Sequence, residues 1–129
     1  MTWKLNHFLM FVVTLGLLAG CQSYEQHAAD RTAQLRLLYP LGTPKQAVHD
    51  KWSGHQPDFS ASRPTDGWNA YPNKYLAEAL TTVETKTGKK IESVERFWGP
   101  DGFLSLARCW YYYDADDRIV DVEWEYMSD

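Results

Sequence analysis

The sequence predicts an α+β domain, with two or three short helices packed on one face of a small antiparallel sheet that ends in a C-terminal hairpin. Alternating apolar and acidic side chains over residues 118–126, after a strand-like segment at 103–113, predict the hairpin. Apolar side chains at helical spacing over residues 73–86 predict one helix, and a Gly-Thr-Pro run at residues 42–44 opens a shorter one. A chain of 129 residues has room for one such domain.

The first elements of the domain are short. Apolar and polar side chains alternate weakly over residues 35–39, which favours a strand that stops at the following proline. The helix after it is expected over residues 44–52. Thr43 can cap its N-terminus, and Pro44 suits the first helical position, where a missing N–H costs nothing.

In the middle of the chain, segments rich in proline and glycine alternate with segments in which apolar residues recur at regular spacing. Residues 55–72 contain three prolines and predict a long irregular loop, in which Trp68 and Tyr71 are expected to pack against the body. After the 73–86 helix, residues 91–98 predict a third short helix with an apolar face. A Gly-Pro-Asp-Gly run at residues 99–102 predicts a turn.

The hairpin register follows from its turn. A four-residue turn at 114–117 would place Tyr113 opposite Arg118. The cross-strand pairs expected from that register are Cys109 with Val122 and Ala107 with Trp124 on the buried face, and Arg108 with Glu123 on the open face.

Residues 1–20 are typical of a bacterial export signal. Lys4 provides a positive start, and residues 8–19 provide a mostly apolar run. Twelve helical residues rise about 18 Å, which is shorter than a hydrocarbon layer of about 30 Å. A removable signal therefore explains this segment better than a spanning helix.

The signal ends in Leu18-Ala19-Gly20-Cys21, which resembles the lipobox of bacterial lipoproteins. The resemblance implies cleavage before Cys21, with diacylglycerol on its sulfur and an acyl chain on its amine. Gln22, rather than aspartate, implies an outer-membrane address. An ordinary secretory signal with a coincidental cysteine is the alternative. The expected organisation is a signal at 1–20, a lipidated tether at 21–34 and a periplasmic α+β domain at 35–129.

Two composition facts narrow the function classes. The formal net charge is −4, so the chain lacks the basic excess with which a protein neutralises nucleic-acid phosphates. The chain has two cysteines, and a lipid on Cys21 would leave Cys109 without an intrachain disulfide partner. Because Cys109 falls on the buried face of the predicted hairpin, we expect it to be a packed core residue.

Two stretches share a spacing in which a valine precedes a tryptophan by four residues and a glycine follows. They are Val48 to Trp52 and Val94 to Trp98. On these features, residues from about 35 to 126 resemble the small outer-membrane lipoproteins of the BamE/SmpA type. The resemblance implies two helices on one face of a small antiparallel sheet, a layout shared with β-lactamase-inhibitor proteins. It also implies a role in assembling outer-membrane proteins. The first stretch lacks a tight Gly-x-Pro turn, and no binding residue of that family transfers to this chain.

Catalytic and metal-binding patterns are weak. His49, Asp50 and His55 could form a zinc site, but a solvated helix end explains them better. The Asp114-x-Asp116 pattern mimics an EF-hand start, although Ile119 stands where that loop requires glycine. Nucleophile-elbow, Walker and dinucleotide signatures are absent. We therefore expect no enzyme activity, no cofactor and no metal.

The open face of the hairpin is the expected interaction surface, because it combines aromatic side chains and an arginine with an acidic rim. Four residues are the candidates for partner binding: Arg108, Trp110, Tyr112 and Glu123. The other members of that face are Leu106, Ile119, Asp121 and Glu125. Alternatively, the 55–72 loop or the tether covers this face.

The sequence thus predicts an outer-membrane-anchored periplasmic lipoprotein that acts as a non-enzymatic binding module in envelope assembly or scaffolding. Its expected partners are the membrane, through the lipid on Cys21, and an envelope protein, but no nucleic acid. The alternative is a periplasmic inhibitor or a ligand- or glycan-binding lipoprotein.

Overall fold

A computed structural model describes residues 23–100 and 106–126 of the chain. The expected signal, Cys21 and Gln22 lie outside the described residues, as do Asp101 and Gly102 of the expected turn.

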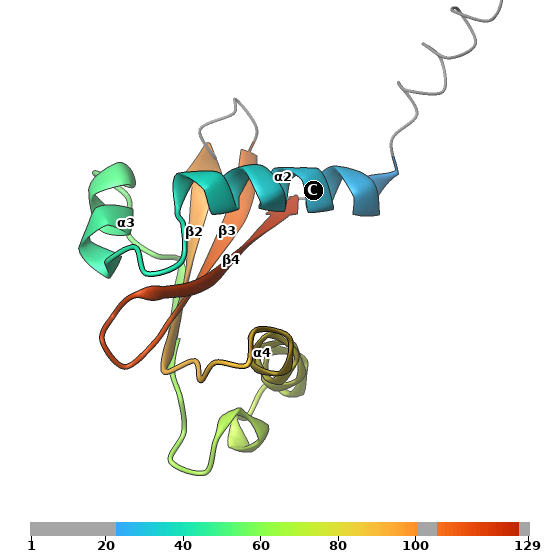
Figure 1. The fold of residues 1–129 in the computed structure, drawn as a ribbon, viewed down its shortest axis with the longest axis vertical. Helices are drawn as coiled ribbons and strands as arrows, with labels where there is room; N and C mark the ends of the chain where they lie inside the picture. The colour runs from blue at the N-terminus through green and yellow to red at the C-terminus, as the bar shows by residue number, and fades with distance from the viewer. Residues whose placement is uncertain (1–22, 101–105, 127–129) are drawn as a thin grey trace, which may run out of the picture.

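The core of the fold is a four-stranded antiparallel sheet with strand order β1-β2-β3-β4 (Figure 1). The strands are β1 (Phe59–Ser62), β2 (Ser93–Pro100), β3 (Leu106–Tyr113) and β4 (Ile119–Tyr126). The helices are α2 (Tyr24–Leu38), α3 (Lys45–Lys51), the 3-10 turn η1 (Trp68–Ala70) and α4 (Lys74–Thr87). This arrangement confirms the α+β class and the C-terminal hairpin.

Helices cover the two faces of the sheet unequally. Helices α2 and α3 pack over one face and bury a cluster that includes Trp52, Phe97 and Tyr111. Helix α4 and η1 lie against the other face, at the end nearer the β3–β4 turn, and bury Trp68 and Tyr112. Helices therefore lie on both faces of the sheet, and among the described residues α4 and η1 cover only part of theirs.

Residues 35–39 are not a strand, because helix α2 continues to Leu38. Leu35 is buried in the core, and the Thr32 hydroxyl accepts a hydrogen bond of 3.1 Å from the Trp124 backbone. Arg36 forms a two-point ion pair with Asp121 at 2.8 and 3.1 Å. The expected boundary at residue 34 thus falls inside a helix that packs on β4. Helix α2 has little amphipathic pattern, so hydrophobic periodicity does not predict it.

The prediction of a helix at residues 91–98 is wrong, because this segment contributes to strand β2. Val94 and Phe97 are both fully buried, but they belong to clusters on opposite faces of the sheet. A strand with buried residues on both faces loses the simple alternation of a half-buried strand. Gly99 and Pro100 continue the strand, so they do not form the expected turn.

The expected loop at 55–72 contains two short elements, strand β1 and the turn η1. The expectation that Trp68 packs on the body is confirmed. Its side chain is 1% exposed, and its Nε1–H donates to the Ile91 carbonyl at 2.8 Å. Tyr71 packs beside Trp68 at 5.7 Å between ring centroids.

The helix predicted at 73–86 is confirmed as α4, which begins after the Asn73 cap and ends at Gly88. The Asn73 side chain accepts hydrogen bonds from the first turn, and Gly88 adopts the left-handed conformation with φ 67°. The buried residues of α4 are Ala77, Leu80 and Val83. Ala77 is buried, whereas Tyr75 is 88% exposed. Helix α3 starts after Pro44 without a side-chain cap, so the expected Thr43 cap is wrong.

The hairpin is confirmed, but its register is shifted by two residues. Cys109 pairs with Trp124 and Arg108 with Glu125. One residue of the shift arises at the turn, where Tyr113 pairs with Ile119 instead of Arg118, and the second comes from a β-bulge between Tyr112 and Tyr113. A shift of two preserves the faces, so Cys109 is buried in the core as expected. The bulge turns Ile119 onto the face covered by α2 and α3, so it is not part of the open face.

Candidate functional site

Among residues 23–100 and 106–126, the part of the sheet that no helix covers lies on the α4 face, which is built from successive rows across the strands. The row nearest the β3–β4 turn is Ala61, Val94, Tyr112 and Asp121. The next row is Phe59, Arg96, Trp110 and Glu123, and the last is Trp98, Arg108 and Glu125. We call the second and third rows the open face.

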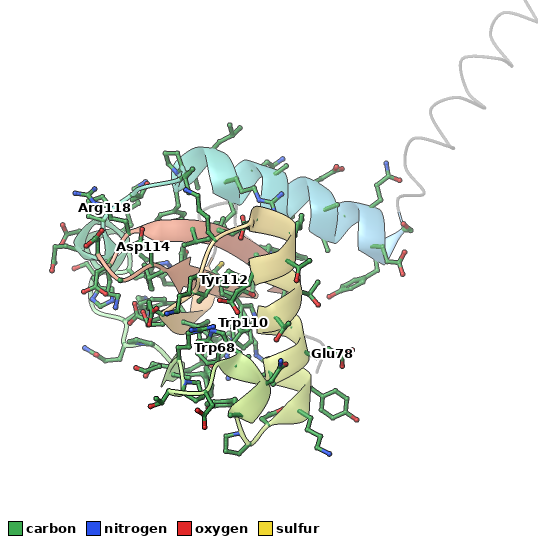
Figure 2. All side chains as sticks on the ribbon, turned by 60° about the horizontal axis from the view of Figure 1, so that its bottom comes forward. Trp68, Glu78, Trp110, Tyr112, Asp114 and Arg118 are labelled. Atoms are coloured by element: carbon green, nitrogen blue, oxygen red, sulfur yellow. The ribbon has the colours of Figure 1, made fainter. Side chains whose placement is uncertain are left out.

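Among the predicted partner-binding residues, Tyr112 is buried and not exposed on the open face. Its side chain is 3% exposed and shares a core cluster with Trp68, Leu80 and Val83. The side chains of Trp68, Trp110 and Tyr112 lie beside helix α4 in Figure 2. The alternative of a covering loop thus holds for Tyr112, because Trp68 comes from the 55–72 segment. Burial also raises the pKa of the Tyr112 phenol well above its usual value.

The other predicted residues, Arg108, Trp110 and Glu123, are half-buried on the open face. Trp98 is 51% exposed beside Arg108, and sequence reasoning missed it because its segment was assigned to a helix. The Arg108 Nε atom is buried with no hydrogen-bond partner among the described residues. A half-exposed tryptophan next to an incompletely paired arginine has the composition of a protein-binding surface.

The polar groups of the open face are held by diagonal hydrogen bonds. The Trp110 Nε1–H donates to Glu125 at 2.8 Å, and the Tyr112 hydroxyl donates to Glu123 at 3.1 Å. Arg108 lies 3.7 Å from Glu125, its cross-strand neighbour, rather than opposite Glu123 as expected. Fixed side chains lose less rotamer entropy when a partner binds, so this surface is partly preorganised.

Arg96 occupies the middle of the second row. Its guanidinium lies 5.7 Å from the Phe59 ring centre and 5.1 Å from that of Trp110. It also pairs with Asp58 at 2.9 Å. These contacts fix Trp110 from the β1 side, while Glu125 holds its ring nitrogen.

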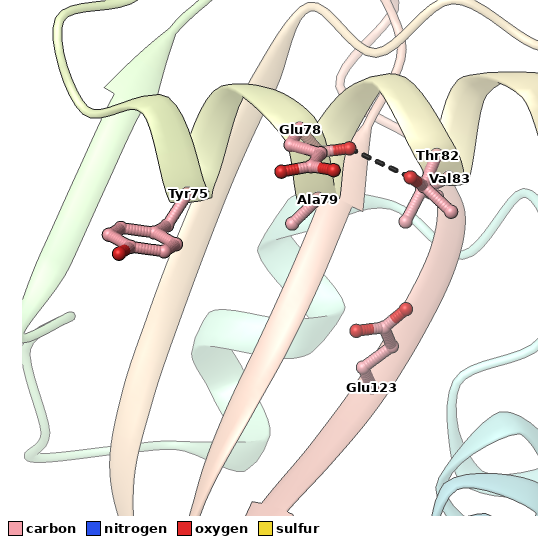
Figure 3. A pocket seen from close by; sticks show the side chains of 6 residues that line it. All are labelled: Tyr75, Glu78, Ala79, Thr82, Val83 and Glu123. Carbon is pink, nitrogen blue, oxygen red and sulfur yellow. Dashed lines mark hydrogen bonds between the residues drawn. The ribbon is translucent and has the colours of Figure 1, made fainter.

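A groove of about 430 Å³ runs between α4 and β4 and continues the open face at Glu123 (Figure 3). Helix α4 lines it with Tyr75, Glu78, Ala79, Thr82 and Val83, and β4 with Glu123. The Thr82 hydroxyl donates to the Glu78 carbonyl of its own helix at 2.8 Å, so its proton is already engaged. The groove therefore offers two carboxylates beside apolar side chains.

The Glu123 carboxylate is partly desolvated. Burial raises its pKa above the ordinary value, against a smaller lowering by the Tyr112 hydrogen bond. The charges of Lys86 and Arg36 also lower the pKa, from longer range, and Asp121 raises it. Desolvation thus outweighs the favourable contacts that Glu123 makes in the isolated protein.

The expected alternatives to a binding site are not assembled. His49 contacts Glu95 at 2.8 Å, Asp50 accepts a bond from Gln46, and His55 packs on Trp52. In the described ranges, no three His, Cys, Asp or Glu side chains gather closely enough to hold a metal ion. The Cys109 thiol is fully buried, as expected of a packed core residue.

None of the helices within residues 23–100 and 106–126 has the length and apolar character needed to cross a bilayer.

Comparison with known protein families, with curated proteins and with solved structures finds no match to this chain.

Proposed function

We propose that the protein is an outer-membrane lipoprotein of the periplasm, anchored through Cys21, whose domain binds an envelope protein on its open face without catalysing a reaction. The signal and the lipobox-like segment at residues 18–21 support the anchor. The observation that carries the binding role is the half-exposed Trp98 beside Arg108 and Trp110 on a sheet face that helix α4 covers only in part.

The residues around Trp98 favour a protein partner. Aromatic and arginine side chains that sit among fixed hydrogen bonds are the usual anchors of protein interfaces. A contiguous exposed apolar patch with a polar rim also marks interaction sites, whereas single exposed apolar residues do not. The BamE/SmpA resemblance points to envelope assembly as the process. However, its second valine–tryptophan stretch lies on β2 rather than on a helix.

The anchor would hold the domain close to the membrane. Helix α2 is capped by Ser23, two residues after Cys21, and it packs on β4 from His27 onward through a ring contact with Trp124. Two peptide units span at most about 7 Å. The expected tether at 21–34 is therefore replaced, in this proposal, by a short link to a packed helix.

Photo-crosslinking in living cells tests the binding role. Trp98→p-benzoylphenylalanine should give one dominant protein adduct that mass spectrometry can identify. Two control positions are Tyr112, which is buried, and Leu37, which is 83% exposed on helix α2 over the opposite face. Neither should give the same adduct. Adducts of glycan fragments at position 98 would instead favour a glycan-binding lipoprotein, and no adduct would contradict both.

The anchor is tested separately. Cys21→Ala should abolish labelling by a radioactive fatty acid and release the domain from the membrane fraction. Cys109→Ala is the matched control, because that thiol is buried in the core and should not carry lipid. Continued labelling of Cys21→Ala would contradict the lipoprotein assignment while leaving the binding role open to the crosslinking test.

A further inference from the structure

An apolar row runs along the side of helix α2 that faces away from the sheet. Ala29, Ala33 and Leu37 are exposed and follow one another at intervals of four residues, which places them in one row on the helix. Leu35 is buried against the sheet, and residues two positions apart lie about 200° from each other around a helix. The row is therefore on the outer side of α2, with Asp30 beside it.

The row widens at the bend that follows the helix. Leu37 and Leu41 are 83% and 63% exposed, and three of the six large apolar side chains that are exposed within residues 23–100 and 106–126 lie at this bend. Because these residues are neighbours along the chain, they form a patch, which we call the leucine corner. A contiguous exposed apolar patch marks a contact with a protein or a membrane. The members of the leucine corner are Leu37, Leu38, Pro40 and Leu41.

The leucine corner is held in place from its inner side. Tyr39 is buried in the core between the exposed leucines. The Lys51 ammonium donates to the Leu38 carbonyl at 2.8 Å, and the Arg118 guanidinium donates to the Gly42 carbonyl at 3.0 Å. These contacts fix the backbone of the bend, so the leucines stay directed outward. They also hold two cations at its edge, in the position that long basic side chains take at a lipid surface.

We propose that the outer row of α2 and the leucine corner rest on the membrane that holds the lipid of Cys21. The occupant of this surface is the boundary between lipid headgroups and acyl chains, into which the exposed leucines insert. This proposal deepens the proposed function and rests on it, because the lipid on Cys21 is what brings helix α2 to the membrane.

The short link to Cys21 favours a membrane over a protein as the occupant. Only Gln22 separates Cys21 from the Ser23 cap of α2. Two peptide units span at most about 7 Å, so the start of α2 lies close to the residue that carries the lipid. The 15 residues of α2 rise about 22 Å. A helix of this length that lies along the surface brings the leucine corner at its other end to the lipid as well.

The membrane contact would orient the open face. Helices α2 and α3 cover one face of the sheet, and the open face lies on the other, with α4. When the outer side of α2 rests on lipid, Trp98 points away from the membrane, where an envelope protein can reach it. A lipid anchor alone leaves the domain free to turn about its link. A second contact through the leucine corner removes that freedom.

Quenching of a fluorophore by lipid measures the contact. The lipidated protein is reconstituted into phosphatidylcholine vesicles that contain a lipid with a nitroxide on its acyl chain. Ala33→Cys accepts one thiol-linked fluorophore, because Cys109 is fully buried and Cys21 carries the lipid. Glu78→Cys, on the exposed side of α4, is the control position. We expect the nitroxide to quench the label at position 33 and not the label at position 78. Equal quenching at both positions, or none at position 33, would overturn the membrane contact.

A double variant tests whether the leucines make the contact. Leu37→Asp with Leu41→Asp alters exposed side chains, so the domain should fold with an unchanged urea midpoint. Tyr75→Asp makes a comparable change at an 88% exposed residue of α4 and is the matched control. The label at position 33 should lose its quenching in the double variant and keep it in Tyr75→Asp. Undiminished quenching in the folded double variant would overturn the leucine corner as the membrane contact.

Two further measurements separate this proposal from the proposed function. If mass spectrometry of the purified protein shows no lipid on Cys21, the proposed anchor and the membrane contact both fail. A lipidated Cys21 without quenching at position 33 overturns the membrane contact alone. Leu37→p-benzoylphenylalanine should give no dominant protein adduct in living cells. Such an adduct would assign the leucine corner to a protein and overturn lipid as its occupant.

Discussion

The hydroxyl of Tyr112 donates a hydrogen bond of 3.1 Å to the carboxylate of Glu123 across strands β3 and β4. This contact assigns different roles to two residues that the sequence places together on one surface. Tyr112 is buried beneath helix α4 and holds Glu123, whereas Glu123 lines the groove. A partner can therefore reach the carboxylate but not the ring that positions it.

Glu123→Gln should stabilise the protein at neutral pH and not in acid. Because burial raises the folded pKa of Glu123, the folded state binds its proton more tightly than the unfolded chain does. The associated stability is present below the ordinary pKa of 4.5 and is lost as the pH rises through the folded value. Urea unfolding at pH 4 and pH 7 measures this difference. A variant that is less stable than the wild type at pH 7 would show that the charged form is favoured by folding.

Leu35 and Leu37 test whether helix α2 belongs to the folded domain. Leu35 is 1% exposed and Leu37 is 83% exposed on the same helix. Leu35→Ala should lower the free energy of unfolding by about 2–5 kcal/mol, because it leaves a cavity against the sheet. Leu37→Ala should change it by less than about 0.5 kcal/mol. Equal small effects in urea unfolding would mean that α2 behaves as a detachable tether.

The elements that sequence predicted well have a clear pattern of apolar and polar residues. Helix α4 carries its apolar residues at helical spacing, and apolar and acidic residues alternate along strand β4, so local pattern was enough. Strand β2 could not be recognised because residues on both of its faces are buried. Helix α2 was hidden because its docking depends on Leu35 and on polar contacts to β4, such as that from Arg36 to Asp121.

The candidate site was predicted in part for the same reason. The alternation of β3 placed Arg108 and Trp110 on one face, and the bulge did not change that face. Trp98 was missed because its strand was assigned as a helix. The burial of Tyr112 depends on Trp68, which is 44 positions away along the sequence and comes from a segment without regular pattern. Such long-range packing has no local signature.

The buried tyrosines predict a loss of stability in alkali. Burial raises the pKa of Tyr39, Tyr111, Tyr112 and Tyr113 above the ordinary value of 10. Their contribution to stability is present below pH 10 and is lost as the pH rises above it, because only the unfolded chain ionises readily. Absorbance at 295 nm and near-ultraviolet circular dichroism should show these phenols ionising together with unfolding. Complete ionisation near pH 10 with a native dichroism spectrum would contradict their burial.

Tyr111→Phe should lower the free energy of unfolding although it removes only the hydroxyl oxygen. The Trp52 ring nitrogen donates to the Tyr111 hydroxyl at 2.7 Å, and both side chains are buried. The phenylalanine would leave that N–H without its acceptor, which costs about 1–3 kcal/mol of unfolding free energy. Tyr71→Phe is the control, because no described hydrogen bond involves that hydroxyl and the residue is half-buried. Similar urea midpoints for the two variants would refute the importance of the Trp52 bond.

Gly99 should not tolerate alanine, because the indole of Trp52 lies against its backbone. A β-carbon at Gly99 would stand 3.2 Å from Trp52 Cζ3 and 3.7 Å from His55. Trp52 cannot withdraw easily, since it stacks on Phe97 at 5.2 Å and is held by Tyr111. Overpacking of this kind costs about 1–3 kcal/mol, so Gly99→Ala should lower the urea midpoint. In a Trp52→Phe background the smaller ring relieves the contact, and the cost of Gly99→Ala should fall. An equal cost in both backgrounds would place the strain in the backbone of β2 instead.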